Sequence, residues 1–209
     1  YPVRKKNFDW KTSLVFSTYK QEVVSLSNDE FNWSELRTGW LSGRGLVGDL
    51  NWTQIIEPGK PLGTWYMPEY AGLSTDGKFL FYTAAGGVTR NLADAERRVV
   101  GSAQPDFEIG WSNYITFLKN FDASISFRGV YGYEIFNTTK LIFGNPIWLP
   151  EINVLQSALD EAARGLNDNP KLSSYYLEDG SFLRLDNLSV GYNIKNVGLI
   201  RNIRVYVAS

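Results

Sequence analysis

The stretch DFEIGWSNYITFLKNFDASISFRGVYGY, residues 106–133, gives the clearest indication of the fold, because apolar and polar residues alternate along nearly all of it. In its first half, the odd-numbered positions, which form one parity of the pattern and would lie on one face of a strand, include Phe107, Ile109, Trp111, Ile115 and Phe117. In its second half, one parity holds Phe121, Ala123, Ile125, Phe127 and Tyr131. A period of two residues is typical of a β-strand, and Lys119-Asn120 between the halves predicts a tight turn. The stretch is therefore predicted to form an antiparallel hairpin.

The same alternation continues on both sides of this hairpin. Residues 8–18 and residues 188–194 alternate in the same way, and residues 200–209 follow as a partner for the latter. A weaker hairpin is predicted within residues 63–85, with its turn at Asp76-Gly77. Together these segments predict an all-β fold with about seven antiparallel strands.

The connections between these strands differ sharply in length. Residues 27–61, 85–105 and 134–180 form long linkers, whereas the other connections are short turns. Long connections are rare in compact soluble domains, and long loops on one rim with short turns on the other are typical of outer-membrane barrels. Within the last linker we predict one short helix that begins at Pro150 and Glu151 and ends at Gly165. Its predicted apolar face holds Ile152, Leu155, Leu159 and Ala162 or Ala163.

The apolar parity of the strands has two possible environments, a soluble protein core or lipid. Across residues 8–18, 107–117 and 121–131 this parity carries no charge. Simple alternation brings Arg184 and Asp186 onto it only near the loop end of their strand. This pattern fits lipid, where a cation costs about 2–4 kcal/mol at the bilayer midplane and about 0–1 kcal/mol near the interface. A soluble β-sandwich core would impose the same exclusion, so this parity alone leaves both readings open.

The opposite parity favours lipid. It is rich in small polar residues, namely Ser13, Ser17, Ser112, Thr116, Ser124, Ser126 and Ser189. Such residues are expected on the wall of a filled or water-lined lumen. Aromatic residues gather beside the short turns, as in an interfacial girdle: Phe8, Trp10, Phe117, Phe121 and Tyr192. About seven strands cannot close in a bilayer without unsatisfied edges, so we expect an arc of a larger transmembrane barrel with long extracellular loops.

Composition excludes several kinds of chemistry. The chain has no Cys and no His, which removes disulfides, thiolate nucleophiles, the usual zinc sites and His-based triads. The net charge is −1 and no basic stripe is visible along the sequence, which argues against nucleic acid as a partner. The acidic pairs Asp94/Glu96 and Glu178/Asp179 are interpreted as solvated loop charges. We therefore expect no catalytic residue, no cofactor, no metal site and no enzymatic activity.

A resemblance to a known family sharpens this expectation. SSYYLEDGSFLRLDNLSVGYNI (residues 173–194), followed by IRNIRVYVAS (residues 200–209), resembles the C-terminal barrel signature of the SusC/RagA family of TonB-dependent outer-membrane transporters of Bacteroidetes. Residues 8–26, 59–73, 103–140 and 153–170 follow in the order of that family. The resemblance implies that residues 1–209 are part of the barrel domain, without the plug domain and the final strands.

By the same resemblance, the complete protein would be a 22-stranded barrel filled by a plug. It would import oligosaccharides across the outer membrane, with a surface lipoprotein of the SusD type as its lid and with energy supplied through TonB, ExbB and ExbD. Import of oligopeptides, as by a RagA-like transporter, is the alternative within the same class. A β-sandwich or barrel adhesin that binds without transporting is the alternative from another class.

Five tryptophans lie in the long loops or at the loop ends of strands: Trp33, Trp40, Trp52, Trp65 and Trp148. An indole face can stack on a sugar ring or grip a peptide, so Trp33, Trp40, Trp52 and Trp148 are candidate substrate-binding residues. Packing within the loops, or against the lid lipoprotein, is the alternative role of these side chains. Glu108 and Arg128 are predicted to face the lumen, either toward the plug or in structural ion pairs.

Overall fold

A computed structural model describes residues 2–43, 46 and 51–209 of the chain, and these residues form two compact units. The first, which we call the sheet unit, comprises Tyr1–Tyr19, Pro105–Gly132 and Gly180–Ser209. The second, which we call the connection unit, comprises Lys20–Gln104 and Tyr133–Asp179. The segment Lys20–Gln104 thus links the first strand pair to the predicted hairpin, and Tyr133–Asp179 links that hairpin to the last two strands.

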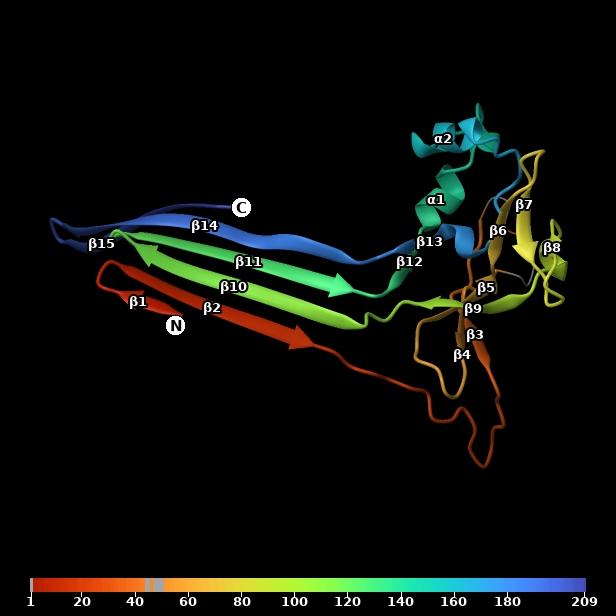
Figure 1. Cartoon of the computed structure of the whole chain (residues 1–209), viewed down its shortest axis with the longest axis horizontal. Coiled ribbons are helices and arrows are strands. Elements are labelled where there is room, and N and C mark those ends of the chain that lie inside the picture. The colour runs from red at the N-terminus through yellow and green to blue at the C-terminus, as the bar shows by residue number, and fades with distance from the viewer. Residues whose placement is uncertain (1, 44–45, 47–50) are drawn as a thin grey trace. The chain divides into compact units, whose positions relative to one another are not determined.

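The sheet unit is one antiparallel sheet with the strand order β1-β2-β10-β11-β14-β15, which Figure 1 shows as a set of long neighbouring ribbons. Its strands are β1 (Val3–Lys5), β2 (Phe8–Ser17), β10 (Phe107–Phe117), β11 (Phe121–Tyr131), β14 (Phe182–Val197) and β15 (Ile200–Ala208). The hairpin expected from residues 106–133 is confirmed, because β10 pairs with β11 from Phe107↔Tyr131 to Phe117↔Phe121. The sheet is open, with β1 and β15 at its edges.

A bulge in β14 corrects the predicted orientation of two charged residues. Ser126 pairs with Asn187, but the next residue, Phe127, pairs with Leu185, so Asp186 is the extra residue. One extra residue exchanges the two faces of a strand beyond it. Arg184 therefore pairs with Arg128 on the polar face, and the apolar position predicted for Arg184 and Asp186 is wrong.

Aromatic rings stack from strand to strand across the apolar face. The ring centroid of Phe107 lies 5.5 Å from that of Phe16 and 5.1 Å from that of Tyr131. The rings of Trp111 and Phe127 are 5.8 Å apart. Such cross-strand pairs hold the register of the sheet. Within the described residues of the sheet unit no second layer covers this face, and Trp111 and Val205 remain 44% and 59% exposed.

The connection unit contains the weaker predicted hairpin. Its strands β6 (Tyr70–Leu73) and β7 (Phe79–Tyr82) pair with each other, and Gly77 has φ +77 at the predicted turn. The hairpin belongs to a three-stranded sheet with β8 (Val88–Thr89), however, and not to the six-stranded sheet. Its assignment to the barrel wall is therefore corrected. The reason is packing, because Phe79 and Phe81 are fully buried with Leu166 in a local core.

The rest of the connection unit consists of short elements. A four-stranded sheet has the order β3-β4-β5-β9, with β3 (Leu36–Thr38), β4 (Gln54–Ile56), β5 (Thr64–Pro68) and β9 (Arg97–Ser102). A two-stranded sheet joins β12 (Glu134–Phe136) and β13 (Leu177–Asp179). The helices are η1 (Leu92–Asp94), α1 (Thr138–Phe143), η2 (Pro146–Trp148), α2 (Ser157–Ala163) and η3 (Ser174–Tyr176). No helix in the described part of the chain has the length and apolar character needed to cross a membrane.

The predicted loop helix is present but shorter than expected. It corresponds to α2, which begins at Ser157, so Ile152 and Leu155 lie outside it. The predicted apolar face is also wrong, because Leu159 is 47% exposed while Ala158 and Glu161 are buried. The end was predicted correctly, since Gly165 follows the helix with φ +90. A second helix, α1, was not predicted.

We expect Gly77→Ala to destabilise the connection unit more than Gly86→Ala does. Both glycines have a positive φ, near +80, which costs alanine about 1–2 kcal/mol. A Cβ at Gly77 would also lie 1.9 Å from the carbonyl oxygen of Gly165, whereas a Cβ at Gly86 would meet nothing within 4 Å. Proteolysis of the connection unit at increasing urea concentration measures the difference. Equal urea midpoints for the two variants would contradict the close contact with Gly165.

Candidate functional site

The polar face of the sheet unit contains a buried carboxylate. The Asp122 side chain is 5% exposed and lies 2.6 Å from the Arg204 guanidinium. The Asn193 side-chain amide donates to the same carboxylate at 2.7 Å. Gly191 leaves room for this arrangement, because a Cβ there would lie 2.7 Å from Nε of Arg204. One carboxylate on β11 therefore binds side chains from both β14 and β15.

A second group of charges lies toward the opposite end of the polar face. Asp186 accepts from Arg128 at 3.0 Å and from Arg184 at 2.7 Å. The bulge in β14 makes these pairs possible, because it turns Asp186 and Arg184 onto the face that carries Arg128. Glu108 and Arg128 line the same shallow groove with Ser112. Their predicted position on one polar face is thus consistent with the structure, and Arg128 forms an ion pair with Asp186.

Two indole N–H groups on the apolar face donate to side chains of neighbouring strands. The indole N–H of Trp10 donates to the Asn113 side-chain oxygen at 2.9 Å, and Asn113 is 6% exposed. The indole N–H of Trp111 donates to the Thr12 hydroxyl at 2.9 Å. In a medium without water an unpaired polar group costs several kcal/mol. These two bonds therefore suit a sheet face that is placed against hydrocarbon.

The structure brings two of the candidate tryptophans together. The rings of Trp40 and Trp52 are 6.4 Å apart and inclined at 57°. The backbone places them there, because the Leu41 N–H donates to the Asn51 carbonyl at 3.0 Å and the Thr53 hydroxyl donates to the Gly39 carbonyl at 2.8 Å. Residues 44–45 and 47–50 of this linker lie outside the described residues. Trp40 is 50% exposed and Trp52 is half-buried, so the pair presents an indole surface to solvent.

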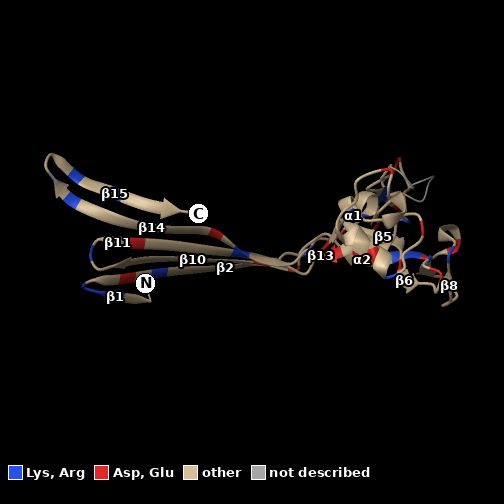
Figure 2. Ribbon diagram, turned by 90° about the horizontal axis from the view of Figure 1, so that it is seen from above, with Lys and Arg blue, Asp and Glu red and all other residues tan. Residues whose placement is uncertain are grey.

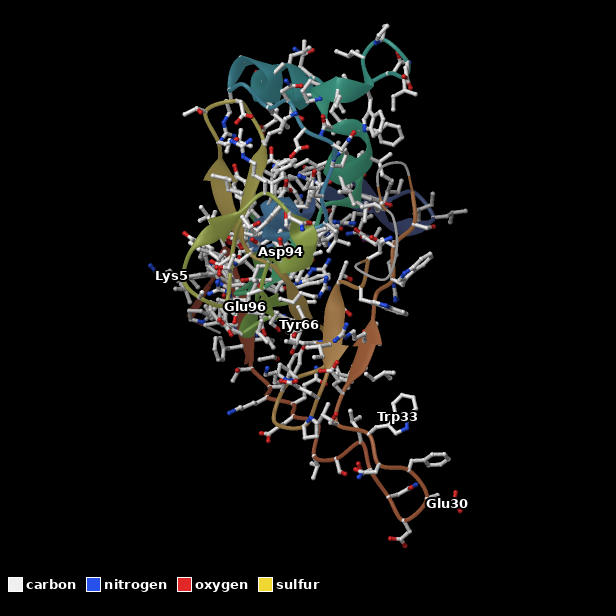
Figure 3. The ribbon with its side chains drawn as sticks, turned by 90° about the vertical axis from the view of Figure 1, so that its right-hand side faces the viewer. Lys5, Glu30, Trp33, Tyr66, Asp94 and Glu96 are labelled. Atoms are coloured by element: carbon white, nitrogen blue, oxygen red, sulfur yellow. The ribbon has the colours of Figure 1, made fainter. Side chains whose placement is uncertain are left out.

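The other tryptophans occupy separate places. Trp33 is 51% exposed and projects from the loop that precedes β3 (Figure 3). Trp148 is half-buried at the end of η2. Trp65 is 8% exposed in a core with Met67 and Leu172, and its N–H donates to the Glu134 carbonyl at 3.0 Å. Trp65 is therefore a core residue, and its role is to pack.

Arg97 adds a cation beside the tryptophan pair, and this residue was not predicted from the sequence. Its guanidinium donates to the Trp52 carbonyl and, at 3.0 Å, to the Tyr66 carbonyl. It also lies over the Tyr66 ring, 5.7 Å from the centroid. Burial lowers the pKa of Arg97, and the positive charge of Arg37 lowers it further. The available signal was the Arg97-Arg98 pair at the start of the apolar segment RRVV.

Chemically, this arrangement offers aromatic surface to a ligand. Trp40 and Trp52 supply apolar ring faces, and Arg97 holds the carbonyl of Trp52 in place. Among the described residues, no three His, Cys, Asp or Glu side chains gather where they could hold a metal ion.

Comparisons with known proteins place this geometry in context. No family model matches the chain. Two curated relatives from Formosa agariphila, named TonB-dependent receptor P3 and TonB-dependent receptor P26, are each 28% identical to it. The matches cover 99% and 98% of this chain and 22% of each relative. In sequence, the chain therefore resembles a segment of these TonB-dependent receptors along nearly its whole length.

Solved structures share the fold of this chain along nearly its whole length. The structure of the RagAB peptide transporter is 22% identical with a TM-score of 0.71, covering 99% of this chain and 23% of that one. The RagAB peptide importer in its open-open state is 24% identical with a TM-score of 0.69, covering 98% of this chain and 23% of that one. The chain thus spans less than a quarter of the proteins it resembles, and its open sheet matches a fragment of their fold.

We expect Arg204→Met to destabilise the receptor far more than Arg184→Met does. Loss of Arg204 leaves the buried Asp122 carboxylate without its cation, and an uncompensated buried charge is costly. Arg184 is the matched control because it is 53% exposed and Asp186 would keep its pair with Arg128. The measurement is the temperature at which the purified receptor loses the gel mobility of its folded form. Arg204→Met should lower this temperature by several degrees, and an equal shift in both variants would contradict the prediction.

Proposed function

We propose that the receptor containing this segment imports oligosaccharides across the outer membrane in a TonB-dependent manner. The single observation that carries the proposal is the open six-stranded sheet with one uncovered apolar face, in a chain that matches TonB-dependent receptors along 99% of its length. An apolar face of this kind is stable against acyl chains, and the indole N–H groups of Trp10 and Trp111 on it are paired within the sheet.

The open edges support a place within a larger barrel. In hydrocarbon, the unpaired backbone groups of β1 and β15 would each cost several kcal/mol. Closure by further strands of the same polypeptide removes this cost. The polar face, with its serines and its ion pairs, would then line the interior, where the resemblance to the SusC/RagA family places a plug. These considerations support a multi-pass β-barrel in the outer membrane.

Substrate binding is proposed at the tryptophan pair in the connection unit. The exposed faces of Trp40 and Trp52 suit a sugar ring, which offers C–H groups to an aromatic face. Trp33 and Trp148 would add further ring surface, either to the substrate or to the lid. The proposed partners are a SusD-like lipoprotein at the long loops and the TonB complex, through parts of the receptor that lie outside this chain.

Import of oligopeptides is the second candidate. It is favoured by the likeness in fold to the RagAB structures, which are a peptide transporter and a peptide importer. The tryptophan pair does not discriminate, because indole rings also bind apolar peptide side chains.

Growth of a deletion strain tests the proposed function. A strain that lacks the receptor should fail to grow on one class of glycan as sole carbon source and should grow normally on defined peptides. If the strain fails to grow on peptides but still grows on glycans, the result would support oligopeptide import instead. Normal growth on both classes, with a receptor that is recovered from cells without detergent, would support the non-transporting binding module and sink the proposal.

The tryptophan pair provides a sharper test. We expect Trp40→Ala and Trp52→Ala each to weaken binding of the imported substrate roughly 2- to 10-fold, because an aromatic contact contributes about 0.5–1.5 kcal/mol beyond the area it buries. The conservative variants Trp40→Phe and Trp52→Phe should retain most of the affinity, as measured by calorimetry on the purified receptor. Phe31→Ala is the matched control, since Phe31 is a 57% exposed aromatic residue of the same unit. Unchanged affinity in both alanine variants would move the binding site elsewhere.

A further inference from the structure

The short turns of the sheet unit form one continuous rim. They connect β1 with β2, β10 with β11, and β14 with β15. The backbone N–H of Leu118 donates to the Asn7 carbonyl at 3.1 Å, and the N–H of Asn193 donates to the Asn120 carbonyl at 2.8 Å. Three hairpins that are distant in the sequence therefore have their turns side by side at the same end of the sheet.

Positive charge gathers along this rim. Figure 2 shows blue segments at the turn end of all three hairpins. Six exposed cations belong to this group, which we call the basic rim: Arg4, Lys5, Lys6, Lys119, Lys195 and Arg201. Lys5, Lys119 and Lys195 line one hollow at this edge. Of the two acids nearby, Asp9 lies 3.9 Å from Arg4 and Asp122 is bound by Arg204, so the rim keeps a strong positive excess.

Two of the cations stand on the apolar side of the sheet. Lys5 pairs with Phe8, and Arg201 has the same parity as Ile203, which pairs with Ile194 on the apolar face. One step inward from the turns lies a row of aromatic rings. The rings of Phe117 and Phe121 are 5.3 Å apart, and those of Phe121 and Tyr192 are 4.7 Å apart.

Along the strands, the aromatic rings lie nearer the middle of the sheet and the cations lie nearer the turns. This order matches the boundary of a bilayer. Aromatic rings settle at the level of the headgroups, and long basic side chains extend past them toward phosphate. We propose that the basic rim binds the phosphate headgroups of anionic phospholipids in the leaflet on the short-turn side of the membrane. The proposal rests on the proposed function, because it requires the sheet to be part of a membrane barrel. In outer-membrane barrels the short turns lie on the periplasmic side.

The arrangement of the cations favours lipid over a soluble anionic partner. A patch that binds a soluble protein or nucleic acid has no need of cations on the hydrocarbon-facing side, where Lys5 and Arg201 lie. Phospholipid headgroups are the phosphate groups that such side chains meet in a membrane. The attraction is electrostatic and weakens within a Debye length, about 8 Å at physiological ionic strength.

The test measures lipid selectivity of the full-length receptor. The purified protein in detergent is incubated with equal amounts of phosphatidylglycerol and phosphatidylcholine that have identical acyl chains, and bound lipids are counted by native mass spectrometry. We expect a preference for phosphatidylglycerol. In the triple variant Lys5→Gln/Lys119→Gln/Arg201→Gln, which removes one cation from each hairpin, the ratio of the two bound lipids should fall about fivefold or more.

A matched control removes the same charge from the connection unit. Lys20→Gln/Lys60→Gln/Arg90→Gln should keep the lipid ratio of the unmodified receptor, and all three proteins must show heat-modifiable gel mobility as evidence of a folded barrel. An unmodified receptor without lipid preference, or a rim variant that keeps the preference, overturns the proposal. If the unmodified receptor lacks heat-modifiable mobility, the proposed barrel function fails as well. Lipid selectivity thus tests the proposed lipid binding, and heat-modifiable gel mobility separately tests the proposed barrel.

Discussion

Every backbone N–H and C=O group of a strand must find a partner, and in hydrocarbon no water can supply one. In the sheet unit the inner strands β2, β10, β11 and β14 satisfy one another, whereas β1 and β15 each have a free edge. The remainder of the structure depends on this constraint. It explains why an uncovered apolar face and an open sheet occur together in a chain that resembles part of a much longer receptor. In hydrocarbon, a sheet with these edges is stable only as an arc of a closed barrel.

The two faces of the sheet are stabilised by different interactions. On the apolar face, stacked rings fill the surface and the polar atoms of Asn113 and Thr12 accept from indole N–H groups. On the polar face, Asp122 gathers Arg204 and Asn193, so that one carboxylate joins three neighbouring strands. The bulge at Asp186 keeps the faces separate along the whole of β14, because it turns Arg184 away from the apolar side. Along β14, charge and apolar surface are thereby segregated, and the cations Lys5 and Arg201 stand on the apolar side only at the turns.

The connection unit follows the rules of soluble proteins. Its cores are small and local: one holds Trp65 and Met67, and the other holds Phe79 and Phe81. These cores support exposed loops that bear the Trp40 and Trp52 pair, with Arg97 fixed below the Trp52 backbone. A rigid framework that presents exposed aromatic rings on loops is a common plan for binding surfaces. The unit therefore suits recognition, while the sheet unit suits the membrane.

The alternation of residues was enough to predict the β10–β11 hairpin, because the period of a strand is a local property that a single apolar face makes strict. It was not enough for the bulge at Asp186, for the place of the β6–β7 hairpin or for the start of α2, since each depends on which distant residues pack or pair there. The sequence placed the tryptophans in the long loops or at the loop ends of strands. Only the fold showed that Trp40 lies against Trp52 and that Trp65 is buried. The basic rim was likewise invisible along the chain, because its cations come from three separate hairpins and only strand pairing brings them to one edge.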